Sequence, residues 1–147
     1  MTNWLDDLAN KAKDKYQAQR QADEKISNAH KLKVTLGRNF WNDLLAAMTK
    51  GASEFDTKFG GSVISAHTTG SDSVEVVAEF TKETRNTVDV SYHPDRHAVG
   101  WGGKSGNPMG VYMLELIADT HLLAVSGQKK LTAEDLAKEI VTFVVTY

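Results

Sequence analysis

The stretch Thr87–Trp101, with the sequence TVDVSYHPDRHAVGW, decides the fold that we expect. Apolar and polar residues alternate on both sides of the segment His93–Arg96, as they do in strands with one buried face. Pro94 is the second residue of that segment, the position where a type I turn favours proline. The stretch therefore predicts an antiparallel hairpin with its apolar residues on one face. The predicted facing pairs are Tyr92 with His97, Val90 with Val99, and Val88 with Trp101.

Four further stretches show strand-like alternation, and the last element of the chain is an expected helix. The four stretches are Val63–Thr69, Val74–Thr81, Val111–Ala118 and His121–Ser126. With the two arms of the hairpin they make six strands, joined by short turns that are typical of antiparallel order. Thr132 is then placed to cap a helix with the apolar stripe Leu136, Ile140 and Val144. The expected fold class is α+β, an antiparallel sheet of about six strands packed against a C-terminal helix.

The first sixty residues predict helices. Residues 3–29 contain no Gly or Pro and are rich in good helix formers. Phe40–Met48 has apolar residues at helical spacing, and Gly51 is placed to end that helix. Phe55 and Phe59 then predict either a second short helix or a continuation past Gly51. We expect residues 1–29 to be a helical extension and residues 30–147 to be a single α+β domain.

The short segment Lys31–Leu36 is compatible with two structures. Leu32, Val34 and Leu36 alternate with polar residues, which predicts a seventh strand, while continuation of the first helix is the alternative. With the strand, the element order from Lys31 onward resembles the helix-grip fold: a strand, two helices, six antiparallel strands and a helix across the sheet. This resemblance concerns the order of elements alone and implies a hydrophobic ligand held between helix and sheet.

Composition excludes several classes of protein. The chain has no cysteine, so it has no disulfide, no cysteine–zinc site and no thiol catalysis. Its net charge of −2 disfavours a nucleic acid as the main partner, because phosphate binding needs a basic surface. No apolar run approaches the roughly 20 residues of a membrane span, and the N-terminal residues lack the pattern of a signal peptide. We therefore expect a cytoplasmic protein without a membrane span.

A glycine-rich segment, Ala98–Ser105, has the relaxed spacing of a phosphate-binding loop. Such a loop needs a helix that begins at its lysine, and the Gly and Pro residues after Lys104 disfavour one, so we expect no nucleotide binding. His93 and His97 flank the turn but would diverge, which disfavours a metal site. We expect no catalytic residue, metal or cofactor. The candidate ligand-binding residues gather around the hairpin and this segment: Tyr92, His97, Trp101 and Lys104.

Three functions are consistent with these features. The first is a non-enzymatic binding module for a small apolar ligand or a protein partner, since an apolar helix covers the expected sheet and no catalytic motif is present. The second is an interaction protein that forms a homodimer through residues 3–29, whose apolar residues include Trp4, Leu5 and Leu8. The third is a small enzyme whose catalytic residues are dispersed along the sequence.

Overall fold

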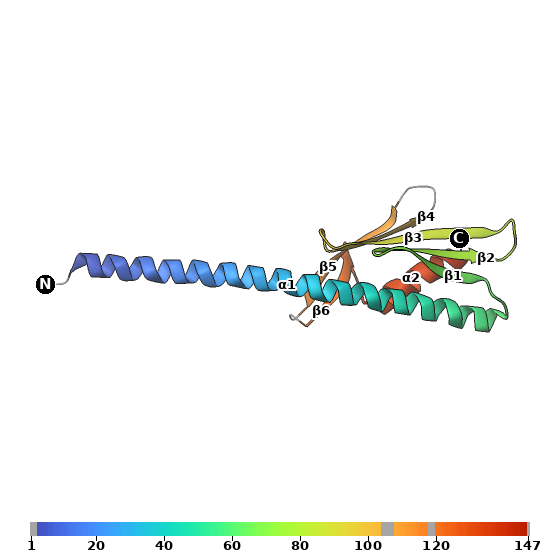
Figure 1. Ribbon diagram of the computed structural model, residues 1–147, viewed down its shortest axis with the longest axis horizontal. Coiled ribbons are helices and arrows are strands. Elements are labelled where there is room, and N and C mark those ends of the chain that lie inside the picture. Colours follow the sequence, from blue (N-terminus) through green and yellow to red (C-terminus); the bar gives the residue numbers. More distant parts are fainter. Residues whose placement is uncertain (1–2, 104–107, 118–119, 147) are drawn as a thin grey trace. The chain divides into compact units, whose positions relative to one another are not determined.

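A computed structural model describes residues 3–103, 108–117 and 120–146 of the chain. The chain divides into two compact units, Met1–Leu32 and Lys33–Tyr147. The first unit is helical throughout its described part. The second unit contains the rest of that helix, a seven-stranded antiparallel sheet and a C-terminal helix, so it has the α+β fold class that the sequence predicts (Figure 1).

A single helix, α1, extends from Trp4 to Phe59. The side chain of Asn3 caps its first turn by accepting a hydrogen bond of 3.2 Å from the backbone N–H of Leu5. The helix ends at Gly60, which adopts a left-handed φ of 87°. The N–H groups of Gly60 and Gly61 both donate to the carbonyl oxygen of Asp56, as expected for a glycine-terminated helix.

The structure decides between the alternatives that the sequence leaves open at two places in this region. Lys31–Leu36 is helical and not a strand, because its short alternation lies between two helix-forming segments with no Gly or Pro to interrupt them. Gly51 does not end the helix either. A side chain there would come within 3.6 Å of Val141 on the C-terminal helix, so this glycine lies at an ordinary packing contact within α1.

Seven strands form one antiparallel sheet in which each strand pairs with the next along the chain (Figure 1). The strands are β1 (Ile64–Gly70), β2 (Ser73–Glu79), β3 (Arg85–His93), β4 (Ala98–Gly103), β5 (Pro108–Ile117), β6 (His121–Ser126) and β7 (Lys129–Leu131). Six of them match the predicted strands to within a few residues. The seventh is β7, a three-residue strand that the sequence does not indicate. The sheet therefore has seven strands, but the seventh is β7 and not the segment Lys31–Leu36.

The β3–β4 hairpin forms with a different register from the predicted one. The observed pairs are Tyr92 with Val99, Val90 with Trp101, and Val88 with Gly103. The N–H of Arg96 donates to the carbonyl oxygen of His93, so Pro94 has its predicted place in the turn. His97 is the last residue of the loop and has a left-handed φ of 49°, while His93 belongs to β3. The four-residue loop is thus displaced by one residue, which shifts every pair by two and leaves each side chain on its predicted face.

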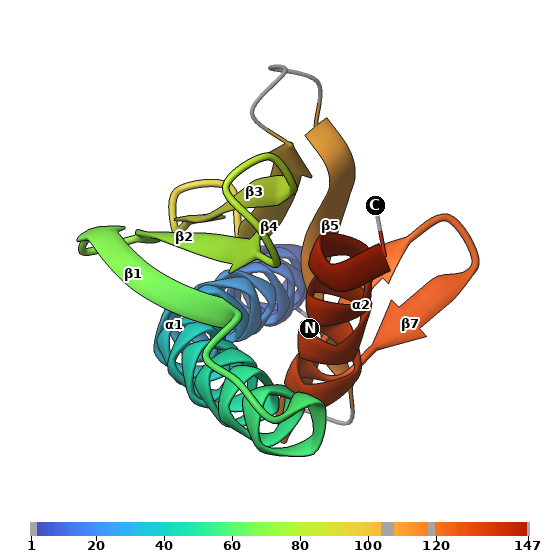
Figure 2. The same ribbon diagram turned by 90° about the vertical axis from the view of Figure 1, so that its right-hand side faces the viewer.

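The C-terminal helix, α2, extends from Ala133 to Thr146 and lies on the same face of the sheet as the second part of α1 (Figure 2). The hydroxyl of Thr132 accepts a hydrogen bond of 3.1 Å from the N–H of Asp135, which confirms the predicted cap. The space between these helices and the sheet is filled by side chains. The largest of those that are fully buried are Trp41, Leu44, Met48, Val76, Val88, Val90, Val99, Leu114, Leu136, Ile140 and Val144.

Candidate functional site: a groove on the outer face of the sheet

Strand β4 has almost no side chains on the outer face of the sheet, the face opposite to the helices. Val99 and Trp101 are buried on the inner face, so the alternation of a strand directs Ala98, Gly100 and Gly102 outward. Gly100 has room for a Cβ, which would make only an ordinary van der Waals contact with the carbonyl oxygen of Gly110 at 3.9 Å. The backbone of β4 therefore forms the floor of a groove.

Side chains from the two neighbouring strands form the walls of this groove. Ser91 of β3 and Val111 of β5 pair with Gly100 from opposite sides, and Asp89 of β3 pairs with Gly102. The groove has a volume of about 500 Å³, within the range of small-molecule sites. Its lining residues are Asp89, Ser91, His93, Arg96, Ala98, Gly100, Trp101, Gly102, Gly103, Val111 and Met113.

The two walls differ in chemistry. On β5, the apolar side chains of Val111 and Met113 are 52% and 48% exposed. On β3, Asp89 supplies a carboxylate, and Glu75 on β2 lies directly opposite Asp89 in the sheet. Two carboxylates that face each other across neighbouring strands repel, so a cation bound near them would be favourable. The arrangement suits a flat apolar group on the floor, with a positive charge directed toward Asp89 and away from Arg96, which lines the groove from the hairpin loop.

The four residues singled out from the sequence are not brought together in this groove. Trp101 is in its floor, but the indole ring packs on the inner face, 5.0 Å from the ring of Phe143 on α2. Tyr92 is also buried on the inner face, stacked 5.8 Å from Trp41 of α1. His97 belongs to the hairpin loop. Lys104 lies outside the described residues, so its place as a ligand contact stays a prediction.

The residues that make the walls are not among those singled out from the sequence. The alternation of β3 places Asp89 on a solvated face, and neither Val111 nor Met113 belongs to a recognisable motif. The sequence nevertheless contains a pattern from which the groove could have been predicted. Once Val99 and Trp101 are assigned to the core, the alternate positions of the same strand are occupied by Ala98, Gly100 and Gly102. Three consecutive outward positions with such small residues predict an open backbone surface.

Two polar clusters on the inner side of the sheet hold the helices in place. In the first, the guanidinium of Arg38 on α1 contacts the carboxylate of Asp72 at 2.6 Å and lies 5.1 Å from the centre of the Tyr92 ring. Burial raises the pKa of the Tyr92 hydroxyl, while the positive charge of Arg38 opposes that change. This cluster therefore links α1 to the β1–β2 turn and to β3.

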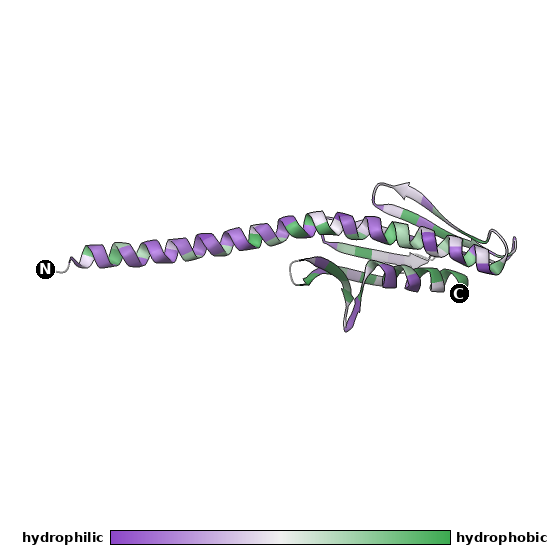
Figure 3. Cartoon of the chain, turned by 90° about the horizontal axis from the view of Figure 1, so that it is seen from below, coloured by the Kyte–Doolittle hydropathy of each residue, from purple (hydrophilic) through white to green (hydrophobic). Residues whose placement is uncertain are grey.

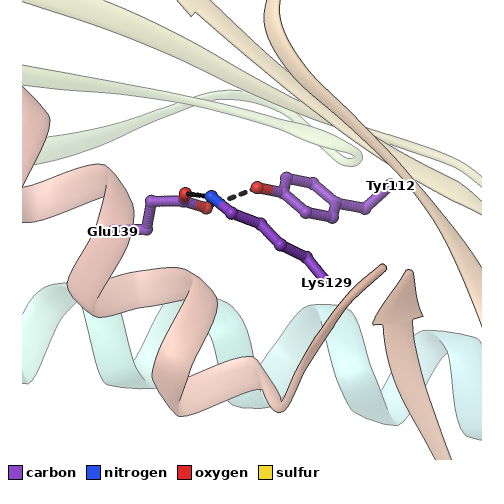
Figure 4. Close-up of polar contacts among 3 residues, drawn as sticks. All are labelled: Tyr112, Lys129 and Glu139. Atoms are coloured by element: carbon purple, nitrogen blue, oxygen red, sulfur yellow. Dashed lines mark hydrogen bonds and ion pairs between the residues drawn. The ribbon is translucent and has the colours of Figure 1, made fainter. Parts of the chain in front are cut away.

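The second cluster joins Tyr112 of β5, Lys129 of β7 and Glu139 of α2 (Figure 4). The Tyr112 hydroxyl donates to Glu139 at 2.5 Å, and the Lys129 ammonium lies 2.7 Å from the other carboxylate oxygen. Burial and the hydrogen bond to Glu139 raise the pKa of Tyr112 to about 12. Burial alone would raise the pKa of Glu139, but the hydrogen bonds from Lys129 and Tyr112 outweigh it and lower that pKa. Tyr112 thus stays protonated at neutral pH and serves as a donor.

Among the described residues, no group of three His, Asp or Glu side chains is placed to hold a metal ion. Neither helix has a stretch within its described residues that is long and apolar enough to cross a membrane. Comparison of the chain with protein-family models, with curated proteins and with solved structures finds no match. The groove and its chemistry are therefore the basis for a functional proposal.

Proposed function

We propose that the protein is a non-enzymatic binding module that takes a small, flat, apolar ligand with a positive charge in the groove over β4. The observation that carries the proposal is the open floor at Gly100, where the fold has room for a side chain and the sequence supplies none. Glycine in the interior of a strand weakens the sheet, so its presence there favours a close approach by another molecule.

The dimensions and the walls of the groove support this class of ligand. A volume of about 500 Å³ accommodates a group of one or two fused rings. A ring that lies on the peptide groups of β4 would contact Val111 and Met113 along one edge. An ammonium group on its other edge would approach Asp89, and the neighbouring carboxylate of Glu75 adds to the negative charge there.

The enzyme hypothesis has less support from the described side chains. The most perturbed titratable group is Tyr112, and its pKa of about 12 makes it a poor base at neutral pH. Its partner Glu139 is already held by Lys129. This cluster lies on the inner side of the sheet and stabilises α2, while the groove is on the outer side. A cytoplasmic location remains a prediction from the sequence.

The proposal is tested with two probes of opposite charge and the same ring system, naphthylmethylammonium and naphthylacetate. Backbone amide signals of the ¹⁵N-labelled protein are followed by NMR during titration with each probe. We expect the cation to shift the amide signals of Gly100 and Gly102 with a dissociation constant of roughly 1 mM, typical of so small a ligand. Naphthylacetate should bind at least about tenfold more weakly because Asp89 repels it.

Matched variants locate the binding. Gly100→Val fills the floor with a side chain that suits a strand, and should abolish the shifts. Ser65→Val places the same side chain on the outer face of β1, two strands away from β3, and should leave the shifts unchanged. Asp89→Asn should remove most of the preference for the cation, whereas Glu79→Gln should not. Equal binding of the two probes, or binding that survives Gly100→Val, would contradict the proposal.

A further inference from the structure

The first part of α1 has no covered face within its own unit. Every residue from Asn3 to Asn28 is exposed, including the largest apolar side chains of the segment. Tyr16 is 69% exposed and Ile26 is 70% exposed. Figure 3 shows the hydrophobic residues of this part of the helix as isolated bands among mostly hydrophilic ones. A polar helix without tertiary contacts is marginal in water, so a contact outside the unit would stabilise this one.

The apolar residues of the segment recur at the spacing of a two-stranded coiled coil. With Leu5 at position a of a seven-residue repeat, the a and d positions form one seam along the helix. The a positions are Leu5, Ala12, Gln19 and Ile26, and the d positions are Leu8, Lys15, Ala22 and Ala29. Six of these eight positions are apolar. The two polar positions, Lys15 and Gln19, lie at the centre of the seam.

The position of those two polar residues favours pairing with a second copy of this helix, and it favours one relative orientation of the two helices. We propose that residues 5–29 pair antiparallel with the same segment of a second copy of the chain. An antiparallel pair places each a position opposite a d position of the partner. The resulting layers are Leu5 with the partner's Ala29, Leu8 with the partner's Ile26, Ala12 with the partner's Ala22, and Lys15 with the partner's Gln19.

These layers match in size and polarity. A large residue meets a small one at each end, and two large residues meet in the next layer. The ammonium of Lys15 faces the amide of the partner's Gln19, whose oxygen accepts a hydrogen bond. A parallel pair in the same register would instead place Lys15 against the partner's Lys15 inside the seam, where two positive charges repel strongly. The sequence thus favours the antiparallel orientation.

The positions that flank the seam add two favourable kinds of contact and one unfavourable kind. Trp4 lies beside the partner's Leu32, and Tyr16 lies beside the partner's Tyr16, so exposed apolar side chains become covered. Lys11, however, lies beside the partner's Lys25, and the two positive charges repel. This repulsion occurs twice in the dimer and gives the proposal a sharp test, because reversing one charge should strengthen the pairing.

The first experiment measures the association of the full chain by sedimentation equilibrium. We expect a dimer that dissociates on dilution, and Lys11→Glu should tighten it about tenfold because two like-charge contacts become two ion pairs. Lys31→Glu makes the same charge change on the side opposite to the seam and should alter the dissociation constant by less than about twofold. A chain that stays monomeric at about 100 µM, or a Lys11→Glu dimer no tighter than wild type, would overturn the proposal.

The second experiment tests the orientation by disulfide formation, which is simple here because the chain has no cysteine. Ala12→Cys and Ala22→Cys are each mild changes on the seam. A mixture of the two variants should form a disulfide-linked dimer on oxidation, while each variant alone should not. Gln17→Cys, on the side opposite to the seam, measures the background. Efficient cross-linking of Ala22→Cys with itself would show a parallel pair and refute the antiparallel one.

Discussion

Two glycines of α1 have opposite expected responses to the same substitution. A Cβ added at Gly37 would overlap the hydroxyl oxygen of Tyr92, with the ring carbon Cζ at 3.5 Å. The Tyr92 ring is only 3% exposed and is stacked against Trp41, so it has little freedom to move away. A Cβ added at Gly51 would meet Val141 at 3.6 Å, an ordinary van der Waals contact.

The magnitudes follow from two opposing effects. Replacing Gly by Ala in a helix interior stabilises by about 1 kcal/mol, because alanine loses less backbone entropy on folding. Overpacking a buried site costs about 1–3 kcal/mol. Gly51→Ala should therefore stabilise the protein by up to about 1 kcal/mol. Gly37→Ala should destabilise it by up to about 2 kcal/mol, since the overlap with Tyr92 outweighs the gain in helix propensity.

Urea denaturation followed by circular dichroism measures both changes, with equal m-values showing that the denatured state is unaffected. The Tyr92→Phe variant supplies the decisive control, because it removes the oxygen atom that a Cβ at Gly37 would overlap. In that background Gly37→Ala should become neutral or stabilising. If Gly37→Ala is as well tolerated as Gly51→Ala, or if Tyr92→Phe does not relieve its cost, the packing described around Tyr92 is wrong.

Three further predictions concern α2, the Tyr112 cluster and the N-terminal unit. Ile140→Ala should cost about 2–5 kcal/mol in urea melts because Ile140 is fully buried, whereas the exposed Lys138→Ala should cost less than about 0.5 kcal/mol. The raised pKa of Tyr112 should make stability fall as pH rises from about 10 to 12, and the lowered pKa of Glu139 should make it fall again as acid protonates that carboxylate. Tyr112→Phe should reduce the alkaline loss, part of which remains because the pKa of Tyr92 is also raised, and an unchanged pH profile in that variant would contradict the assignment. Deletion of residues 1–28 should leave a folded domain with a similar melting temperature, and an unfolded truncated chain by circular dichroism would place the helix in the core.

The parts of the fold that sequence predicted are those where a pattern repeats. Each of β2, β3 and β5 has several alternating positions, and α2 has a capping residue followed by a buried stripe. Prediction left two structures open where the pattern was too short to distinguish the strand period from the helix period. The three alternations in Lys31–Leu36 fit a strand, but uninterrupted helix-forming sequence on both sides decides in favour of α1. Strand β7 has three residues and forms because β6 offers an edge to pair with.

The register error and the missed groove both arise in the segment from His97 to Gly103. A left-handed residue such as His97 carries no sequence signature comparable to glycine, so the displacement of the loop by one residue could not be foreseen. The groove is missed for a different reason. The glycines after Trp101 are typical of a loop between strands, and the sequence predicts a loop there. In the structure β4 continues to Gly103, so Gly102 is a strand residue on the outer face of the sheet.

The glycines around β4 serve two different purposes, and only one of them is explained by packing. A Cβ at Gly110 would lie 2.8 Å from Nε1 of Trp101 and 3.0 Å from Cε2 of Tyr112, so the inner face requires a glycine at that position. Gly100 has no such requirement, since the nearest atom to its Cβ would be 3.9 Å away and its backbone is an ordinary strand segment. A valine at position 100 would pair with Val111 across the strands and stabilise the sheet. Among the residues that the structure describes, packing thus gives no reason for a glycine at position 100, whereas the ligand that we propose would lie on the backbone of β4 and need that space.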